Sequence, residues 1–115
     1  VFAPAAALLA TGATVDAMAV PAACLEQPDW PDDLFRIVYI DCYGNAITGV
    51  RASRIDASQE VSVNGHRLKS ARTFSDVAPG NAFWYENSNG LVEVAVNRGR
   101  ADQVLGIEVG TPLSL

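Results

Sequence analysis

Residues 40–48 read Ile40-Asp41-Cys42-Tyr43-Gly44-Asn45-Ala46-Ile47-Thr48, a polar stretch between two apolar runs. The pattern predicts a tight connection between two strands. Gly44 and Asn45 favour a turn, because glycine adopts positive φ without cost and asparagine tolerates the left-handed region. By that chemistry alone the stretch is a turn. An aromatic ring, an amide and a carboxylate within five positions also suit a site that stacks on a flat ring, reads its edge and holds a cationic group.

Short apolar runs continue from Leu34 onward, with turn signals at intervals of about ten residues, as is typical of a β-sandwich or barrel. The clearest signal is Asn64-Gly65, which favours a two-residue hairpin turn. A short helix is predicted before Gly106, which is a natural helix stop. The sequence therefore predicts a mainly β fold, with strands over 34–40, 45–50, 61–63, 66–70, 82–85, 91–96 and 113–115.

The first 33 residues have a different character. Pro4 and the alanine-rich run 5–10 predict a short helix that ends at Thr11-Gly12, and its apolar surface is expected to be buried. Residues 13–33 are rich in proline and predict an extended linker. We therefore expect two regions: 1–33, which forms the end of a preceding domain and a linker, and 34–115, which forms the folded β domain. A chain that starts on valine in mid-pattern resembles a piece of something longer.

Composition limits the classes of partner. The 115 residues suffice for one modest core, and half of them are hydrophobic. The net charge of -5 and the scattered placement of the eight Lys and Arg argue against nucleic acid. Pro4, Gly12 and Asp16 interrupt the N-terminal apolar run, so no membrane span is expected. Cys24 and Cys42 lack metal-type spacing, so we expect no metal and reduced thiols in a cytoplasmic protein.

Spacing alone identifies no catalytic group. The one histidine, His66, follows a predicted hairpin turn, where exposure to solvent is the expected state. No Ser/His/Asp set, zinc-protease motif or phosphate loop is present. Glu93 interrupts an apolar strand, and we interpret it as part of a solvated strand face. No catalytic residue is therefore predicted within this chain.

Three polar turns remain as candidates, at 41–45, 86–90 and 97–100. In an antiparallel sheet, turns separated by an odd number of strands open toward the same end, so two or three of them could converge into one pocket. Each turn taken singly is explained by solvation. Their content of Asn, Ser and Asp beside aromatic residues favours a small polar ligand.

Several of these motifs occur in order in one known family. The stretch 40–48, the segment Phe74 through Gly80 and the run Tyr85-Glu86-Asn87-Ser88-Asn89-Gly90-Leu91-Val92-Glu93-Val94-Ala95-Val96-Asn97 resemble the C-terminal domain of S-adenosylmethionine hydroxide adenosyltransferases. These enzymes hydrolyse S-adenosylmethionine and are related to the fluorinating and chlorinating enzymes that attack the same molecule. Residues 1–6 are similar to the segment that ends the family's larger N-terminal domain.

The resemblance implies a small antiparallel β-barrel, a homotrimer and a ligand held between the C-terminal domain of one subunit and the N-terminal domain of its neighbour. It implies six substrate-binding residues. Asn45 matches the amide that reads adenine, with Tyr43 packed beside it, and the main chain after Asn97, at Arg98, matches a second adenine contact. Asp41 and Ser88 match positions that hold the methionine end. S-adenosylmethionine is the substrate in this family, and no cofactor is implied.

Departures from the family pattern refine that expectation. Cys42 stands where arginine is common and Gly49 where asparagine is frequent, so the edge of the pocket differs. Asn89 stands where the halogenating relatives carry arginine, which favours hydrolysis. The Asp, Arg and His group that activates water belongs to the family's N-terminal domain, so this chain alone is expected to be inactive. The alternative hypothesis is a non-catalytic β-barrel module used for assembly or interaction.

Overall fold

The computed structural model describes residues 2–115, and the chain divides into two compact units, Val1–Trp30 and Pro31–Leu115. The first unit contains the helix α1 (Phe2–Ala10) and the 3-10 turn η1 (Ala22–Cys24). The hydroxyl of Thr11 donates to the carbonyl of Leu8 at 2.9 Å, and Gly12 follows at φ +74°, which ends α1 as predicted. The expectation that α1 is buried is not met, because none of its residues is buried in the structure. Among the described residues, no helix combines the length and the apolar character that a membrane crossing requires.

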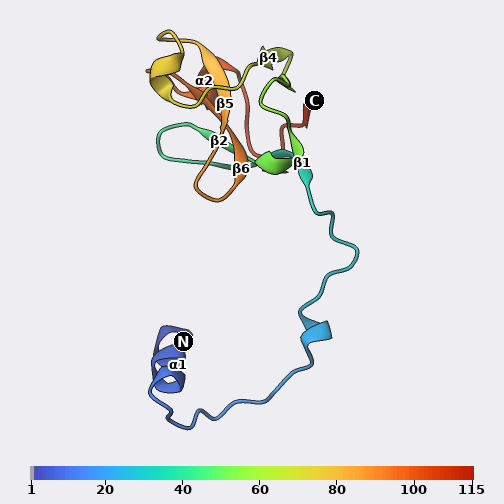
Figure 1. Ribbon diagram of the computed structural model, residues 1–115, viewed down its shortest axis with the longest axis vertical. Helices are drawn as coiled ribbons and strands as arrows, with labels where there is room; N and C mark the ends of the chain where they lie inside the picture. The colour runs from blue at the N-terminus through green and yellow to red at the C-terminus, as the bar shows by residue number, and fades with distance from the viewer. Residues whose placement is uncertain (1) are drawn as a thin grey trace. The chain divides into compact units, whose positions relative to one another are not determined.

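The second unit holds two antiparallel sheets (Figure 1). The four-stranded sheet has the order β1-β2-β6-β5 and the three-stranded sheet the order β4-β3-β7. The strands and the short helices between them are β1 (Leu34–Ile40), β2 (Ala46–Arg51), η2 (Ala52–Arg54), β3 (Val61–Val63), β4 (His66–Leu68), η3 (Phe74–Asp76), β5 (Ala82–Glu86), β6 (Leu91–Val96), α2 (Ala101–Val104) and β7 (Leu113–Ser114). Every predicted strand is present, with ends that differ by at most two residues, and the mainly β prediction is confirmed.

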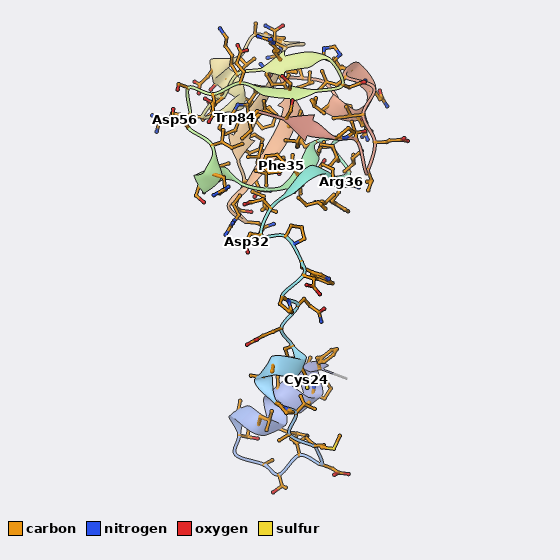
Figure 2. All side chains as sticks on the ribbon, turned by 90° about the vertical axis from the view of Figure 1, so that its right-hand side faces the viewer. Cys24, Asp32, Phe35, Arg36, Asp56 and Trp84 are labelled. Atoms are coloured by element: carbon orange, nitrogen blue, oxygen red, sulfur yellow. The ribbon has the colours of Figure 1, made fainter. Side chains whose placement is uncertain are left out.

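Apolar side chains from both sheets form the core of this unit (Figure 2). Ile37 of β1, Val61 of β3 and Val94 of β6 are fully buried. Trp84 of β5 is 4% exposed, and its indole N–H donates to the carbonyl of Gln59 at 3.1 Å, so the one polar atom of the ring is satisfied. The core therefore lies between one face of each sheet.

The register of the pairing between β2 and β6 shifts between Ile47 and Arg51. The buried hydroxyl of Thr48 donates to the carbonyl of Val92 at 2.8 Å and accepts from the amide of Val50 at 3.1 Å, so it replaces ladder bonds there. A Cβ at Gly49 would lie 2.7 Å from Leu34 Cβ. Gly49, which stands where the family often has asparagine, therefore lies where β1 approaches the backbone of β2 closely.

Asp33, just before β1, forms hydrogen bonds with Arg51 at the end of β2. Its side chain is 6% exposed and accepts from the amide of Arg51 at 2.9 Å, from Arg51 Nε at 3.1 Å and from Arg51 Nη2 at 2.8 Å. Arg54 Nε lies 3.3 Å from the same carboxylate. These bonds, together with the charges of Arg51 and Arg54, lower the pKa of Asp33 from 3.8 to about 2.

This shift predicts a specific loss of stability in acid. Because the pKa is lower in the folded chain, the carboxylate stabilises the fold above about pH 4, and the contribution disappears as the pH falls toward about 2. We expect Asp33→Asn to reduce the difference between the urea midpoints at these two pH values. Asp56 and Asp102 keep their own lowered pKa in both proteins and serve as an internal control. An equal fall in midpoint for Asp33→Asn and wild type would show that Asp33 has no such role.

Candidate functional site

The turn after β1 is held by its own carboxylate. Asp41 Oδ1 accepts from the amides of Tyr43 and Asn45, both at 2.9 Å, and Asp41 Oδ2 accepts from Asn45 Nδ2 at 3.2 Å. The backbone closes the turn, with the amide of Gly44 donating to the carbonyl of Asp41 at 3.0 Å. Asp41 therefore fixes the side chain of Asn45 as well as the main chain around it.

The amide of Asn45 is buried but only partly used. Asn45 is 9% exposed, whereas Tyr43 next to it is 74% exposed. No hydrogen bond within residues 2–115 uses Asn45 Oδ1, and Nδ2 donates only to Asp41. An asparagine side chain offers two donors and an acceptor with two lone pairs, so one N–H and the carbonyl oxygen stay available to a flat heterocycle. The arrangement presents a fixed amide edge beside an exposed aromatic ring.

The segment around α2 supports this turn from the other side. Arg100 Nη1 donates to the carbonyl of Cys42 at 2.9 Å, and the amide of Asp102 donates to the carbonyl of Gly44 at 3.2 Å. Arg100 also forms a bidentate pair with Asp102, with distances of 3.1 and 2.8 Å. The bond to Arg100 lowers the pKa of Asp102, and the bond to Asp102 raises the pKa of Arg100. This ion pair was not anticipated from the sequence, since residues two apart on a chain carry no pairing signal of their own.

Asn97 and Arg98 begin the same segment. Asn97 Nδ2 donates to the carbonyl of Val77 at 2.6 Å, and the main chain of Asn97 exchanges hydrogen bonds with the loop at Gly80 and Asn81. Arg98 is exposed and has φ +56°, an unusual conformation for a residue other than glycine. The structure thus brings together the 41–45 and 97–100 turns, which are two of the three predicted turns.

Ser88 lies in the third turn, at the other end of the same strands. The 87–90 turn precedes β6, whereas the 41–45 turn precedes β2, and β2 pairs antiparallel with β6. The paired positions Ala46–Val94 and Arg51–Leu91 mark the two ends. From Leu91 to Val94 is roughly 10 Å along the strand. Two of the three turns therefore meet at one end of the sheet, as the sequence allowed, and the 87–90 turn lies at the other end because strand order decides which end each turn occupies.

Glu93 is buried, contrary to the interpretation of a solvated strand face. It is 5% exposed, because β6 is covered on both faces. On the face away from the core, Glu93 neighbours Tyr85 of β5, whose ring belongs to an aromatic cluster with Phe74 and Phe83 at centroid distances between 5.1 and 5.9 Å. Tyr85 Oη donates to Glu93 Oε1 at 2.5 Å and Asn87 Nδ2 donates to Glu93 Oε2 at 2.9 Å. Burial, this bond and the charges of Glu93 and Asp41 raise the pKa of Tyr85.

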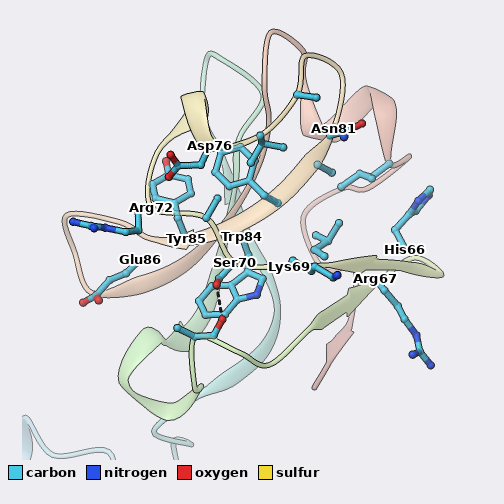
Figure 3. A pocket seen from close by; sticks show the side chains of 18 of the residues that line it. His66, Arg67, Lys69, Ser70, Arg72, Asp76, Asn81, Trp84, Tyr85 and Glu86 are labelled. Atoms are coloured by element: carbon cyan, nitrogen blue, oxygen red, sulfur yellow. Dashed lines mark hydrogen bonds between the residues drawn. The ribbon is translucent and has the colours of Figure 1, made fainter.

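A cavity of about 1170 Å³ lies along β4 and β5, and its lining includes Trp84, Tyr85 and Glu86 of β5 (Figure 3). Trp84, Phe83 and Leu68 contribute apolar surface, and His66, Arg67, Lys69 and Arg72 stand around it (Figure 3). None of the six predicted substrate-binding residues lines it. His66 is exposed there, as predicted from its place after the Asn64-Gly65 turn. Within the described part of the chain, no three His, Cys, Asp or Glu side chains gather as ligands for a metal ion.

Comparison with known proteins identifies the family. A family model described as SAM hydroxide adenosyltransferase C-terminal domain matches residues 35–114, nearly the whole second unit. The chain belongs to this family. The matched segment contains all six residues that the resemblance implicated, although the match assigns no role to any of them.

The curated proteins that this chain resembles share one name. A protein of Thermus thermophilus named (R)-S-adenosyl-L-methionine hydrolase is 38% identical over 100% of this chain and 46% of its own length. A protein of Salinispora arenicola with the same name is 38% identical over 98% of this chain and 47% of its own length. The chain therefore spans about half the length of the curated relatives it matches.

Solved structures agree in fold with this family member. A crystal structure of a conserved hypothetical protein from Thermus thermophilus has a TM-score of 0.75 and 37% identity, and the alignment covers 99% of this chain and 50% of that one. An uncharacterized conserved protein from Thermotoga maritima has a TM-score of 0.60 and 28% identity, over 68% of this chain and 33% of that one.

Proposed function

We propose that this chain is the substrate-binding domain of an enzyme that hydrolyses S-adenosylmethionine to adenosine and L-methionine. The observation that carries the proposal is the buried amide of Asn45, fixed by Asp41 and open on one edge beside Tyr43. Adenine offers adjacent donor and acceptor groups that an asparagine amide satisfies in pairs. The name of the relatives from Thermus and Salinispora supports the choice of substrate.

In this proposal the other predicted residues complete the contacts. Tyr43 packs on the adenine ring, and the main chain at Arg98, displayed by the turn after Asn97, makes a second adenine contact. Asp41 supplies a negative charge for the α-ammonium group, a charge-assisted interaction that is stronger than a neutral one. Ser88 contacts the methionine end from the opposite end of β2 and β6, so the ligand extends across the outer face of these strands.

The chemistry itself requires positioning more than proton transfer to the leaving group. The oxygen of a water molecule or hydroxide forms a bond to C5′ of the ribose, and the bond from C5′ to the sulfonium sulfur breaks. The electron pair of that bond goes to sulfur, which leaves as the neutral thioether of methionine, and one proton is released. Holding the substrate in line and away from bulk water lowers the barrier. The group that activates water belongs to the N-terminal domain that precedes this one in the family.

The assembly is also part of the proposal. The full-length protein is a cytoplasmic homotrimer in which this domain faces the N-terminal domain of a neighbouring subunit. The two sheets approximate the small barrel that the family implies, because isolated bridges link their edges at Arg36–Pro112 and at Ser70–Trp84. These bridges support a closed barrel, because one joins β1 to the segment before β7 and the other joins the segment after β4 to β5. Each is a single bridge and not a continuous ladder of hydrogen bonds.

Hydrolysis of S-adenosylmethionine in water enriched in oxygen-18 tests the proposed function. We expect the full-length protein to release adenosine labelled at the 5′-hydroxyl, together with unlabelled methionine, because water attacks carbon and not sulfur. The 115-residue chain alone should give no adenosine above the uncatalysed rate. Failure of the full-length protein to form adenosine would favour the non-catalytic module, and turnover by the 115 residues would contradict the division of roles between domains.

A further inference from the structure

Glu93 is a buried carboxylate that no cation neutralises within the described part of this chain. Its exposed fraction is 5%, and no lysine, arginine or histidine of residues 2–115 forms an ion pair with it. Burial of a charged carboxylate is costly unless hydrogen bonds compensate for the lost water. Its two oxygens are instead satisfied by two neutral donors, Tyr85 Oη at 2.5 Å and Asn87 Nδ2 at 2.9 Å. An arrangement this costly calls for a role beyond filling space in the strand.

Tyr85 is a firmly placed donor to this carboxylate. Its ring lies in the cluster with Phe74 and Phe83, and it stands directly opposite Glu93 in the β5–β6 pairing. A phenol is protonated at neutral pH, and the hydroxyl of Tyr85 donates to Glu93 Oε1. Glu93 is thereby held in one orientation, with Oε2 directed to Asn87.

Asn87 connects Glu93 to the turn that follows β5 by hydrogen bonds. Its Nδ2 donates to Glu93, and its Oδ1 accepts from the amides of Asn89 at 2.9 Å and Leu91 at 3.1 Å. The amide of Gly90 closes the same turn on the carbonyl of Asn87 at 2.9 Å. Both polar atoms of the Asn87 side chain are thus engaged, and Ser88 stands between two residues whose positions this network sets.

We propose that Glu93 is a positioning residue that, through Asn87, sets the place of Ser88 and thereby the affinity for the methionine end of the substrate. The inference rests on the proposed function. Asn45, which reads adenine in the proposed function, lies at the other end of β2 and β6 and forms no hydrogen bond with Tyr85, Glu93 or Asn87, so the network bears on the Ser88 turn and not on the adenine contact. Loss of Glu93 should therefore weaken binding of S-adenosylmethionine and leave binding of adenosine unchanged.

The test uses the full-length protein with Glu93→Gln, Asn87→Ala and the double variant. Glutamine is nearly the same size as glutamate, but it has one acceptor oxygen in place of two and cannot accept from both Tyr85 and Asn87. We expect each single variant to raise KM for S-adenosylmethionine about tenfold. The double variant should be no worse than either single one, because both break the same path. The dissociation constant for adenosine, measured by calorimetry, should stay within about twofold of wild type for all three.

Different results separate the two levels of the proposal. If Ser88→Ala raises KM while Glu93→Gln leaves it unchanged, the positioning role of Glu93 is wrong and the proposed function stands. If the effects of Glu93→Gln and Asn87→Ala add, or adenosine binding falls with them, Glu93 has a general structural role and the inference is overturned. Absence of any hydrolysis by wild type would instead overturn the proposed function.

Tyr85→Phe keeps the inference testable if Glu93→Gln does not fold. This substitution removes one donor and leaves the carboxylate in place. It should raise KM for S-adenosylmethionine in the same direction, with adenosine binding unchanged. An unchanged KM for a folded Tyr85→Phe protein would count against the positioning role of the network.

Discussion

Replacing Asn45 by alanine in the full-length protein is expected to weaken adenosine binding about 10- to 100-fold. The substitution removes the one amide that is buried, fixed by Asp41 and open on its remaining edge. An enzyme site built to hydrogen-bond a heterocycle loses roughly 1–3 kcal/mol when the paired contact is removed. Calorimetric titration with adenosine measures the change.

Asn89→Ala is the matched control for that experiment. Asn89 is exposed and lies in the 87–90 turn, at the far end of the β2–β6 pair, and we expect its loss to leave the adenosine affinity unchanged. Asn45→Asp keeps the size of the side chain, but it replaces the donating N–H₂ group by an oxygen that repels the Asp41 carboxylate, so it should weaken adenosine binding at least as strongly as alanine does. Unchanged affinity for Asn45→Ala would show that the 41–45 turn does not read adenine.

Gly44→Ala is expected to destabilise the fold by about 2–5 kcal/mol, since two effects combine at this position. Gly44 has φ +85°, a conformation that costs an L-residue roughly 1–2 kcal/mol. A Cβ there would also lie 2.7 Å from Arg100 Cβ and 2.7 Å from Asp102 Oδ1. The turn could then no longer lie against the α2 segment, and the adenosine affinity of the full-length protein should fall as well.

Gly80→Ala separates the two effects. Gly80 has φ +84°, almost the same as Gly44, and nothing lies within 4 Å of an added Cβ. Urea unfolding of the 115-residue chain should therefore show the backbone cost alone for Gly80→Ala and a further loss of about 1–3 kcal/mol for Gly44→Ala. Equal losses would mean that contact between Gly44 and the Arg100–Asp102 pair contributes nothing to stability.

Much of the fold was predictable because its signals are local. The apolar alternation of 91–96, the Asn64-Gly65 turn and the Thr11-Gly12 helix end each depend on a few neighbouring residues. The family resemblance was equally accessible, since it rests on motifs that occur in order along the chain.

What escaped prediction depends on which strands are neighbours. The β2 and β6 strands are far apart in sequence, so their pairing, and with it the separation of Ser88 from Asn45, follows from strand order alone. The burial of Glu93 depends on Tyr85, which lies opposite it on β5 and packs against Phe74. The support of the 41–45 turn by Arg100 likewise joins segments 58 positions apart.

The most direct test of the central claim is a crystal structure of the full-length protein with adenosine. We predict that the adenine edge lies within hydrogen-bond distance of the Asn45 amide, with the ring beside Tyr43 and the main chain of Arg98 close to it. Adenine bound elsewhere, for example in the cavity beside Trp84 and Lys69, with the 41–45 turn open to solvent, would contradict the account.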